Sequence, residues 1–225
     1  MLYCGIVAAG PYVQLATLAE VRTDEPPIRL HATFYEPGSA AQVGLQLRHL
    51  GEVAVGVGLA LGEGRRADQE LRRRGVNPLP PTDAGQRLLA SAGLAPYAGG
   101  GGGDVVEEGA YATTPAFETH PDGVFYALRG VKLPAKRHPL GIELRIEELQ
   151  DEHVEDEDDL WHRRIEELEA AAVALAAHRY AIGHACWVGD PAEGVVVLPG
   201  SRLPDVFSGE GVIPPVPRTP LPPHE

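Results

Sequence analysis

The stretch VAVGVGLAL, residues Val53–Leu61, decides the fold class of this chain. It is a continuous apolar run, which is typical of a strand that is buried on both faces, as in a parallel pairing. A helix is predicted directly before it, because Ser39 can cap a helix that runs to about His49 with an apolar stripe along one side. The chain therefore enters a buried strand from a helix.

Three further strands are predicted before that helix, over residues 2–8, 12–21 and 28–35. Tight turns at Gly10-Pro11 and at 24–27 separate them, so they form an antiparallel meander. Antiparallel strands followed by a helix and a buried strand indicate an α/β fold with a mixed sheet. The remaining predicted elements are a strand at 115–119, helices at 121–128, 139–150 and 159–181, and a strand at 195–198.

Length and composition predict one domain. The chain has 225 residues, of which 44% are hydrophobic, enough to build a single core. We expect the domain to span 1–207, with an insertion at about 62–114 and a proline-rich tail at 208–225. The glycine run at 99–103 predicts a flexible loop. No Lys-Ser/Thr follows it, so it is not a phosphate-binding P-loop.

The charge is acidic and unevenly placed. The net charge is −13, and residues 141–225 hold 6 basic against 18 acidic side chains. Such a chain repels nucleic acid unless a local basic patch or metal ions compensate. The dense basic cluster is made of arginines 65, 66, 72, 73 and 74.

Cellular location is predicted from the cysteines and the apolar runs. Cys4 and Cys186 are too few for a disulfide framework and suggest a reducing compartment. No apolar run reaches the roughly 20 residues that span a bilayer, and the first residues lack a signal-peptide pattern. We expect a cytoplasmic protein without membrane partners.

Three segments resemble one known family when taken in order. They are GEGRRADQELRRRG (62–75), FETHPDGVFYALRG (117–130), and AAVALAAHRYAIG with VGDPAEGVVVLP (171–199). Together they resemble domain-of-unknown-function family 429, a set of predicted nucleases, over roughly residues 3–199. The resemblance implies a ribonuclease H-like fold, with a mixed five-stranded sheet flanked by helices.

The resemblance also implies site residues. Glu118 and His120 match a Glu-x-His-Pro motif, and Glu169 falls where the family has an acid near the start of its C-terminal helix. These residues, with Asp68, are the implied catalytic set, and Glu118 and Glu169 are the implied metal ligands. The implied substrate-binding residues are Arg65, Arg66, Arg72 and Lys136.

Two acidic positions of the family are substituted in this chain. The family's first strand reads Gly-Ile-Asp, where this chain has Val7 after Gly5 and Ile6. A later family strand ends in an Asp followed one residue on by Pro, and Gly56 and Gly58 stand at those positions. Strands ending at Val7 and Gly56 would place no carboxylate at the sheet centre. A site for Mg²⁺ or Mn²⁺ needs clustered oxygen ligands, so we expect metal binding to be weak or absent.

Each candidate also has a structural interpretation. Glu118 can pair with an arginine such as Arg66, and His120 can cap a turn instead of acting as a base. The arginines can form a solvated helix face, with Asp68 and Glu70 as partners, instead of a phosphate clamp.

Two further clusters favour structural roles. The acids between 143 and 169 lack the glycine of a calcium loop and indicate a solvated acidic face. His178, His184 and Cys186 match no common zinc spacing.

Three functions stay open from the sequence. The first is a nuclease-like protein whose metal site has degenerated, with weak or no catalysis. The second is an active phosphoester hydrolase that uses the remaining carboxylates. The third is a non-catalytic scaffold whose arginines hold an anion. The expected partners are nucleic acid or a phosphorylated small molecule.

Overall fold

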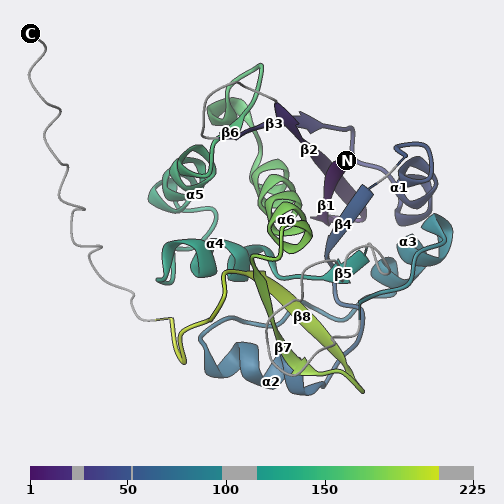
Figure 1. Ribbon diagram of the computed structural model, residues 1–225, viewed down its shortest axis with the longest axis vertical. Coiled ribbons are helices and arrows are strands. Elements are labelled where there is room, and N and C mark those ends of the chain that lie inside the picture. Colours follow the sequence, from purple (N-terminus) through teal and green to yellow (C-terminus); the bar gives the residue numbers. More distant parts are fainter. Residues whose placement is uncertain (22–27, 52, 98–115, 208–225) are drawn as a thin grey trace, which may run out of the picture.

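The computed structural model describes residues 1–21, 28–51, 53–97 and 116–207. They contain one mixed eight-stranded sheet in the order β6-β3-β2-β1-β4-β5-β8-β7 (Figure 1). Its strands are β1 (Leu2–Ala9), β2 (Tyr12–Val21), β3 (Arg29–Phe34), β4 (Val53–Gly58), β5 (Ala116–Glu118), β6 (Val154–Glu155), β7 (Ala185–Asp190) and β8 (Gly194–Pro199).

The predicted fold class is confirmed. Strands β1, β2 and β3 form the antiparallel meander, and β4 pairs in parallel with β1, as the apolar run predicted. Strand β5 continues the parallel part beside β4. The five strands β3-β2-β1-β4-β5 therefore have the ribonuclease H-like arrangement, in which β2 alone runs against the others. The count of five is too low for the whole sheet, because β6, β8 and β7 extend it.

Helices cover both faces of the sheet (Figure 1). The residues of α1 and α3 pack with Cys4 and Ile6 on one face, and α6 lies on the other. The helices are α1 (Ala40–Leu47), α2 (Arg66–Arg73), α3 (Ala84–Ala92), α4 (Pro121–Arg129), α5 (Pro139–Asp151) and α6 (Ile165–Ala181), with a 3₁₀ turn at Leu160–His162. Ser39 caps α1 through a complete capping box, as predicted.

Helix α6 lies unusually close to the sheet because two glycines face it. Gly5 and Gly56 are opposite each other in the register of β1 and β4. A Cβ on Gly5 would come within 2.0 Å of the Ala170 carbonyl oxygen, and one on Gly56 within 2.7 Å of the Val173 carbonyl oxygen. The alanine-rich sequence of α6 supplies the small side chains that this approach needs. Thirteen of its residues from 167 to 180 are buried, so α6 forms the central helix of the core.

Several predicted boundaries were wrong. Strand β1 runs to Ala9, past Val7 and the predicted end at residue 8, and β4 ends at Gly58, past Gly56 but before Leu61, where the apolar run ends. The helix predicted from residue 159 begins at Ile165, because Asp159 has a positive φ of 71° and starts the 3₁₀ turn. Strands β6 and β7 were not predicted, since β6 has two residues and β7 ends in Gly-Asp. The glycine run 99–103 and the tail 208–225 lie outside the described residues.

No helix among the described residues is long and apolar enough to cross a membrane.

Candidate functional site

The carboxyl ends of the parallel strands meet at one edge of the sheet. Strand β4 ends at Gly58 and β5 ends at Glu118, and the Thr119 N–H donates to the Val57 carbonyl at 3.0 Å. Helix α4 then begins at Pro121, within three residues of the end of β5. Edges of this kind are where open α/β sheets place their sites. Most of the predicted site residues come from the segments around this edge.

Glu118 is held by Arg65 in a buried, two-pronged ion pair. Arg65 Nη2 lies 2.6 Å from Glu118 Oε1, and Nη1 lies 2.8 Å from Oε2. The Leu61 N–H donates a third hydrogen bond to Oε2 at 2.9 Å. Burial raises the pKa of the Glu118 carboxyl, and the Arg65 guanidinium opposes that shift. Both oxygens of Glu118 are therefore occupied by donors of this chain.

Asp68 completes the same cluster. It accepts from the Arg65 backbone N–H at 2.9 Å and from Arg65 Nη2 at 3.3 Å. All three side chains are less than 10% exposed. The cluster joins the start of α2 to the end of β5 and brings Arg65 and Asp68 together with Glu118. The partner of Glu118 is Arg65 and not Arg66.

His120 caps helix α4. Its Nδ1 accepts from the Gly123 N–H at 3.2 Å, so its Nε2 carries the proton and donates to the Asn77 carbonyl at 2.7 Å. Burial lowers the pKa of the imidazole. Both ring nitrogens are engaged with the backbone, which leaves none to take a proton from a substrate or water.

Glu169 lies in a second, separate ion pair. Lys136 Nζ is 2.8 Å from Glu169 Oε1 and 3.0 Å from Oε2. The carboxylate is buried, whereas the Lys136 side chain is 42% exposed. Burial raises the pKa of Glu169, and Lys136 opposes the shift. The lysine predicted to bind substrate therefore neutralises the acid predicted to bind metal.

A buried arginine that the sequence analysis missed positions this lysine. Arg145 is fully buried and donates to the carbonyl oxygens of Pro134 at 3.1 Å and Gly141 at 2.8 Å. Its Nη2 also lies 2.6 Å from Asp122 Oδ1, at the start of α4. Arg145, which belongs to α5, thus ties the turn that carries Lys136 to its own helix and to the start of α4. It lies inside a stretch of acidic side chains, and no sequence pattern distinguished it.

The register of the parallel strands shows which of the two glycines, Gly56 or Gly58, lies beside Val7. Gly58, not Gly56, is opposite Val7, and a Cβ on Gly58 would come within 2.9 Å of Val7 Cγ1. Gly56 instead faces the backbone of α6 at Val173. Val7 is buried against Ala170, the neighbour of Glu169 in α6. Val7 and Gly58 are therefore the pair without ligand atoms at the sheet edge near Glu169.

The side chains at this edge do not fit a divalent metal. Such an ion needs several oxygen ligands directed at one point. Here Glu118 and Glu169 each give both oxygens to a cation of the chain. Among the residues that the structure describes, no three His, Cys, Asp or Glu side chains are grouped to hold a metal.

The remaining arginines of α2 lie away from this edge. Arg66 is exposed and pairs with Glu70, with Nε 3.0 Å from Oε1, and Arg74 Nη1 lies 3.4 Å from Glu70 Oε2. Arg72 is exposed and makes no ion pair within the described residues. Arg66 and Arg72 are thus not brought together with the Glu118 cluster.

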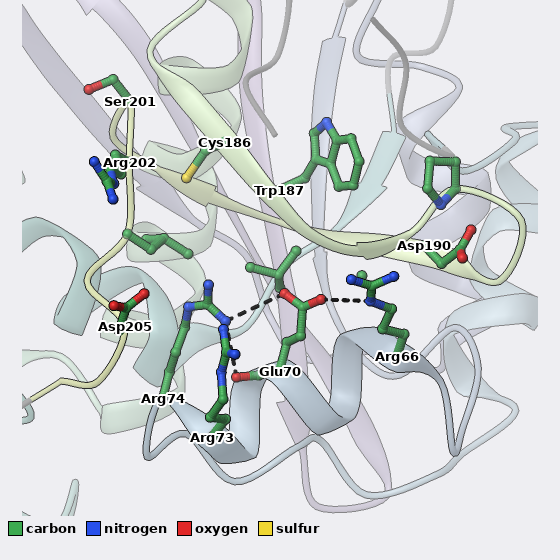
Figure 2. A pocket seen from close by; sticks show the side chains of 14 residues that line it. Arg66, Glu70, Arg73, Arg74, Cys186, Trp187, Asp190, Ser201, Arg202 and Asp205 are labelled. Atoms are coloured by element: carbon green, nitrogen blue, oxygen red, sulfur yellow. Dashed lines mark hydrogen bonds and ion pairs between the residues drawn. The ribbon is translucent and has the colours of Figure 1, made fainter. Parts of the chain in front are cut away.

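A cavity of about 800 Å³ lies between α2, β7 and the segment 201–205 (Figure 2). Figure 2 shows Glu70 between Arg66 and Arg74 on α2, and Asp190 at the end of β7. Arg202 and Asp205 come from the C-terminal segment. The arginine cluster of the sequence analysis supplies part of the lining of this cavity. Arg202 follows Arg74 by 128 residues, so the spacing in the sequence did not indicate that both line one cavity.

Comparison with known proteins gives one family and a distant structural likeness. The family described as "Protein of unknown function (DUF429)" matches residues 41–193. The solved structure of Thermus thermophilus RuvC is similar with a TM-score of 0.42 and 15% sequence identity, over 80% of this chain and 94% of that chain. No match was found among curated proteins.

Proposed function

The chain belongs to the DUF429 family, and on that premise we propose that it is a nuclease-like scaffold whose metal site has been replaced by internal ion pairs. Metal-dependent phosphoester cleavage is accordingly weak or absent. The observation that carries this proposal is the contact of Lys136 Nζ with both oxygens of Glu169, at 2.8 and 3.0 Å. An ammonium group so placed occupies the side of the carboxylate that a metal ion would need.

The other members of the predicted catalytic set support the same conclusion. Both carboxylate oxygens of Glu118 accept hydrogen bonds from Arg65 or Leu61. Both ring nitrogens of His120 form hydrogen bonds with backbone groups. Val7 and Gly58, beside the start of α6, have no ligand atoms. A phosphoester hydrolase would need at least one of these groups to reach a water or a metal.

The direct test is thermal unfolding with and without about 1 mM Mn²⁺, because an ion that binds only the folded state raises the Tm. The same samples are assayed for cleavage of labelled DNA and RNA oligonucleotides. We expect no metal-dependent rise in Tm and no cleavage above that of a Glu169→Gln control. A rise in Tm, or cleavage, that the control lacks would show a working metal site and overturn the proposal.

A further inference from the structure

We propose that the cavity between α2, β7 and the segment 201–205 binds a sugar phosphate, either free or as part of a mononucleotide. This site goes beyond the proposed loss of catalysis and uses different residues from the ion pairs of Glu118 and Glu169. Its volume of about 800 Å³ lies in the range of small-molecule sites, roughly 300–1,000 Å³.

Two guanidinium groups in the lining have no carboxylate partner among the described residues. The cavity is lined by Arg66, Glu70, Arg73 and Arg74. These four are spaced i, i+4, i+7 and i+8 along α2 and its C-cap, so they share one face of the helix. Glu70 engages Arg66 and Arg74. Arg73, and Arg202 from the facing segment, make no ion pair within the part of the chain that the structure describes.

These two arginines suit a phosphate monoester. Guanidinium groups bind phosphate oxygens through paired, charge-assisted hydrogen bonds. Arg73 lies on α2 and Arg202 on the facing segment, so the two arginines can approach a bound phosphate from different walls of the cavity. Glu70 holds the side chains of Arg66 and Arg74 in the same lining through its two ion pairs. These two arginines therefore add positive charge near the phosphate without a change of conformation.

The acids of the lining restrict the kind of ligand. The cavity has four arginines and three carboxylates, Glu70, Asp190 and Asp205, and the whole chain has a net charge of −13. A polyphosphate or a nucleic-acid backbone would be repelled by this surrounding charge. Ionised carboxylates accept hydrogen bonds, and the hydroxyl groups of a sugar can donate them. A sugar that carries a single phosphate would provide hydrogen-bond partners for both the arginines and the carboxylates of the lining.

The walls of the cavity are held in place by the fold. The Phe207 N–H donates to the Arg74 carbonyl at 3.1 Å and ties the C-terminal segment to the end of α2. Gly189 lies against α2, where a Cβ would come within 2.7 Å of Ala67 Cβ. Figure 2 shows the indole of Trp187 on the side of β7 away from Arg66 and Glu70. The arginines therefore face the strand across a preformed space.

The test is calorimetric titration of the full chain at low salt with ribose 5-phosphate, adenosine 5′-monophosphate and inorganic phosphate. The key variant is Arg73→Gln with Arg202→Gln. The matched control is Arg72→Gln, which removes the same charge from the same helix but not from the cavity lining. Circular dichroism checks that the variants fold, which is expected because all three arginines are exposed.

We expect ribose 5-phosphate or the mononucleotide to bind more tightly than inorganic phosphate. The double variant should weaken that binding by about tenfold or more, equivalent to about 1.4 kcal/mol, and the control should change it by less than about twofold. Binding by only one of the two organic probes would identify the source of the sugar phosphate.

Three results would overturn the inference. They are no binding of either organic probe, inorganic phosphate binding as tightly as the sugar phosphates, and an equal loss in the Arg72→Gln control. The last would indicate a diffuse attraction of anions to α2. These outcomes are separate from the Mn²⁺ test, because neither Arg73 nor Arg202 contacts Glu118 or Glu169.

Discussion

Gly58 lies beside Val7 across the parallel strands β4 and β1, so close that a Cβ on Gly58 would be 2.9 Å from Val7 Cγ1. The two residues are at the sheet edge near Glu169, and neither side chain supplies a ligand atom for a metal ion. Gly56, two residues earlier, has a different role, because its bare backbone lets α6 approach. Substitutions at the two glycines should therefore have different effects.

Gly56→Ala is expected to lower the free energy of unfolding by about 3 kcal/mol, the upper part of the usual range for overpacking a core. The added Cβ would meet the Val173 carbonyl oxygen at 2.7 Å, and backbone cannot rotate aside. Urea unfolding measures the change. Gly38→Ala is the control, because its Cβ would first meet a side-chain methyl at 3.3 Å, and we expect a loss below about 1 kcal/mol. Equal losses would contradict the close-packing argument.

Arg65→Met should destabilise the fold by about 3–5 kcal/mol, since it leaves the buried Glu118 and Asp68 carboxylates without their cation. Arg66→Met removes a cation whose side chain is 63% exposed and should change stability by less than about 0.5 kcal/mol. Chemical unfolding of both variants gives the comparison. Similar values for the two would show that the Arg65 cluster contributes no more than a surface pair.

The Lys136–Glu169 pair should show a coupling energy on the order of 1 kcal/mol in a double-mutant cycle, because Lys136 is partly exposed. The variants are Lys136→Gln, Glu169→Gln and the double substitution. Lys136→Gln alone should be the least stable at pH 8, since it leaves a buried carboxylate unpaired. Additive effects within error would mean that the two groups do not interact in solution.

Glu148 should make stability fall as the pH rises above 4.5. Burial raises the pKa of its carboxyl from 4.5 to about 7, although Arg129 opposes the shift. A carboxyl whose pKa is higher in the folded state stabilises the fold at low pH, and that contribution is lost as the pH rises through about 7. The total is on the order of 3 kcal/mol.

The measurement is the free energy of unfolding at several pH values between 4.5 and 8. Glu148→Gln should remove this part of the pH dependence, so the wild type loses stability relative to the variant over the range. Glu147→Gln, the more exposed neighbour that also faces Arg129, should keep the wild-type slope. Parallel curves for wild type and Glu148→Gln would refute the assignment.

A metal site should be recoverable only when the lysine is removed as well. The variant with Val7→Asp, Gly58→Asp and Lys136→Gln would bring two new carboxylates beside a Glu169 without its cation. Mn²⁺ at ten times its Kd should then raise the free energy of unfolding by about 1.4 kcal/mol. The pair Val7→Asp with Gly58→Asp, which keeps Lys136, should respond much less. The opposite order would show that Lys136 does not block the carboxylate.

The sequence predicted the fold well because its signals were local. The apolar run of β4, the capping box at Ser39 and the Pro121 helix start each depend on a few neighbouring residues, and each was found. The cap formed by His120 was also among the predicted alternatives. Strand β7 was missed because its sequence, ACWVGD, has no clear alternation and ends in residues that are rare in strands.

The candidate site was predicted less completely, because its contacts depend on register and on distant segments. Gly56 and Gly58 differ by one pleat, and only the pairing with β1 shows which of them lies beside Val7. The pairing of Lys136 with Glu169 spans 33 residues, and that of Arg65 with Glu118 spans 53. Neither spacing follows from a helical or strand period, so the sequence named these residues without showing that they neutralise one another.

The two ion pairs also make single substitutions at this edge costly. A lone carboxylate at Val7 would be buried among apolar side chains, and loss of Lys136 alone would leave Glu169 without a counter-charge. Each first step toward the metal site proposed for the triple variant therefore costs stability before any cation can be bound. Under the proposed function, the resident lysine and arginine disfavour a stepwise gain of metal binding, because the intermediates with a single substitution are unstable.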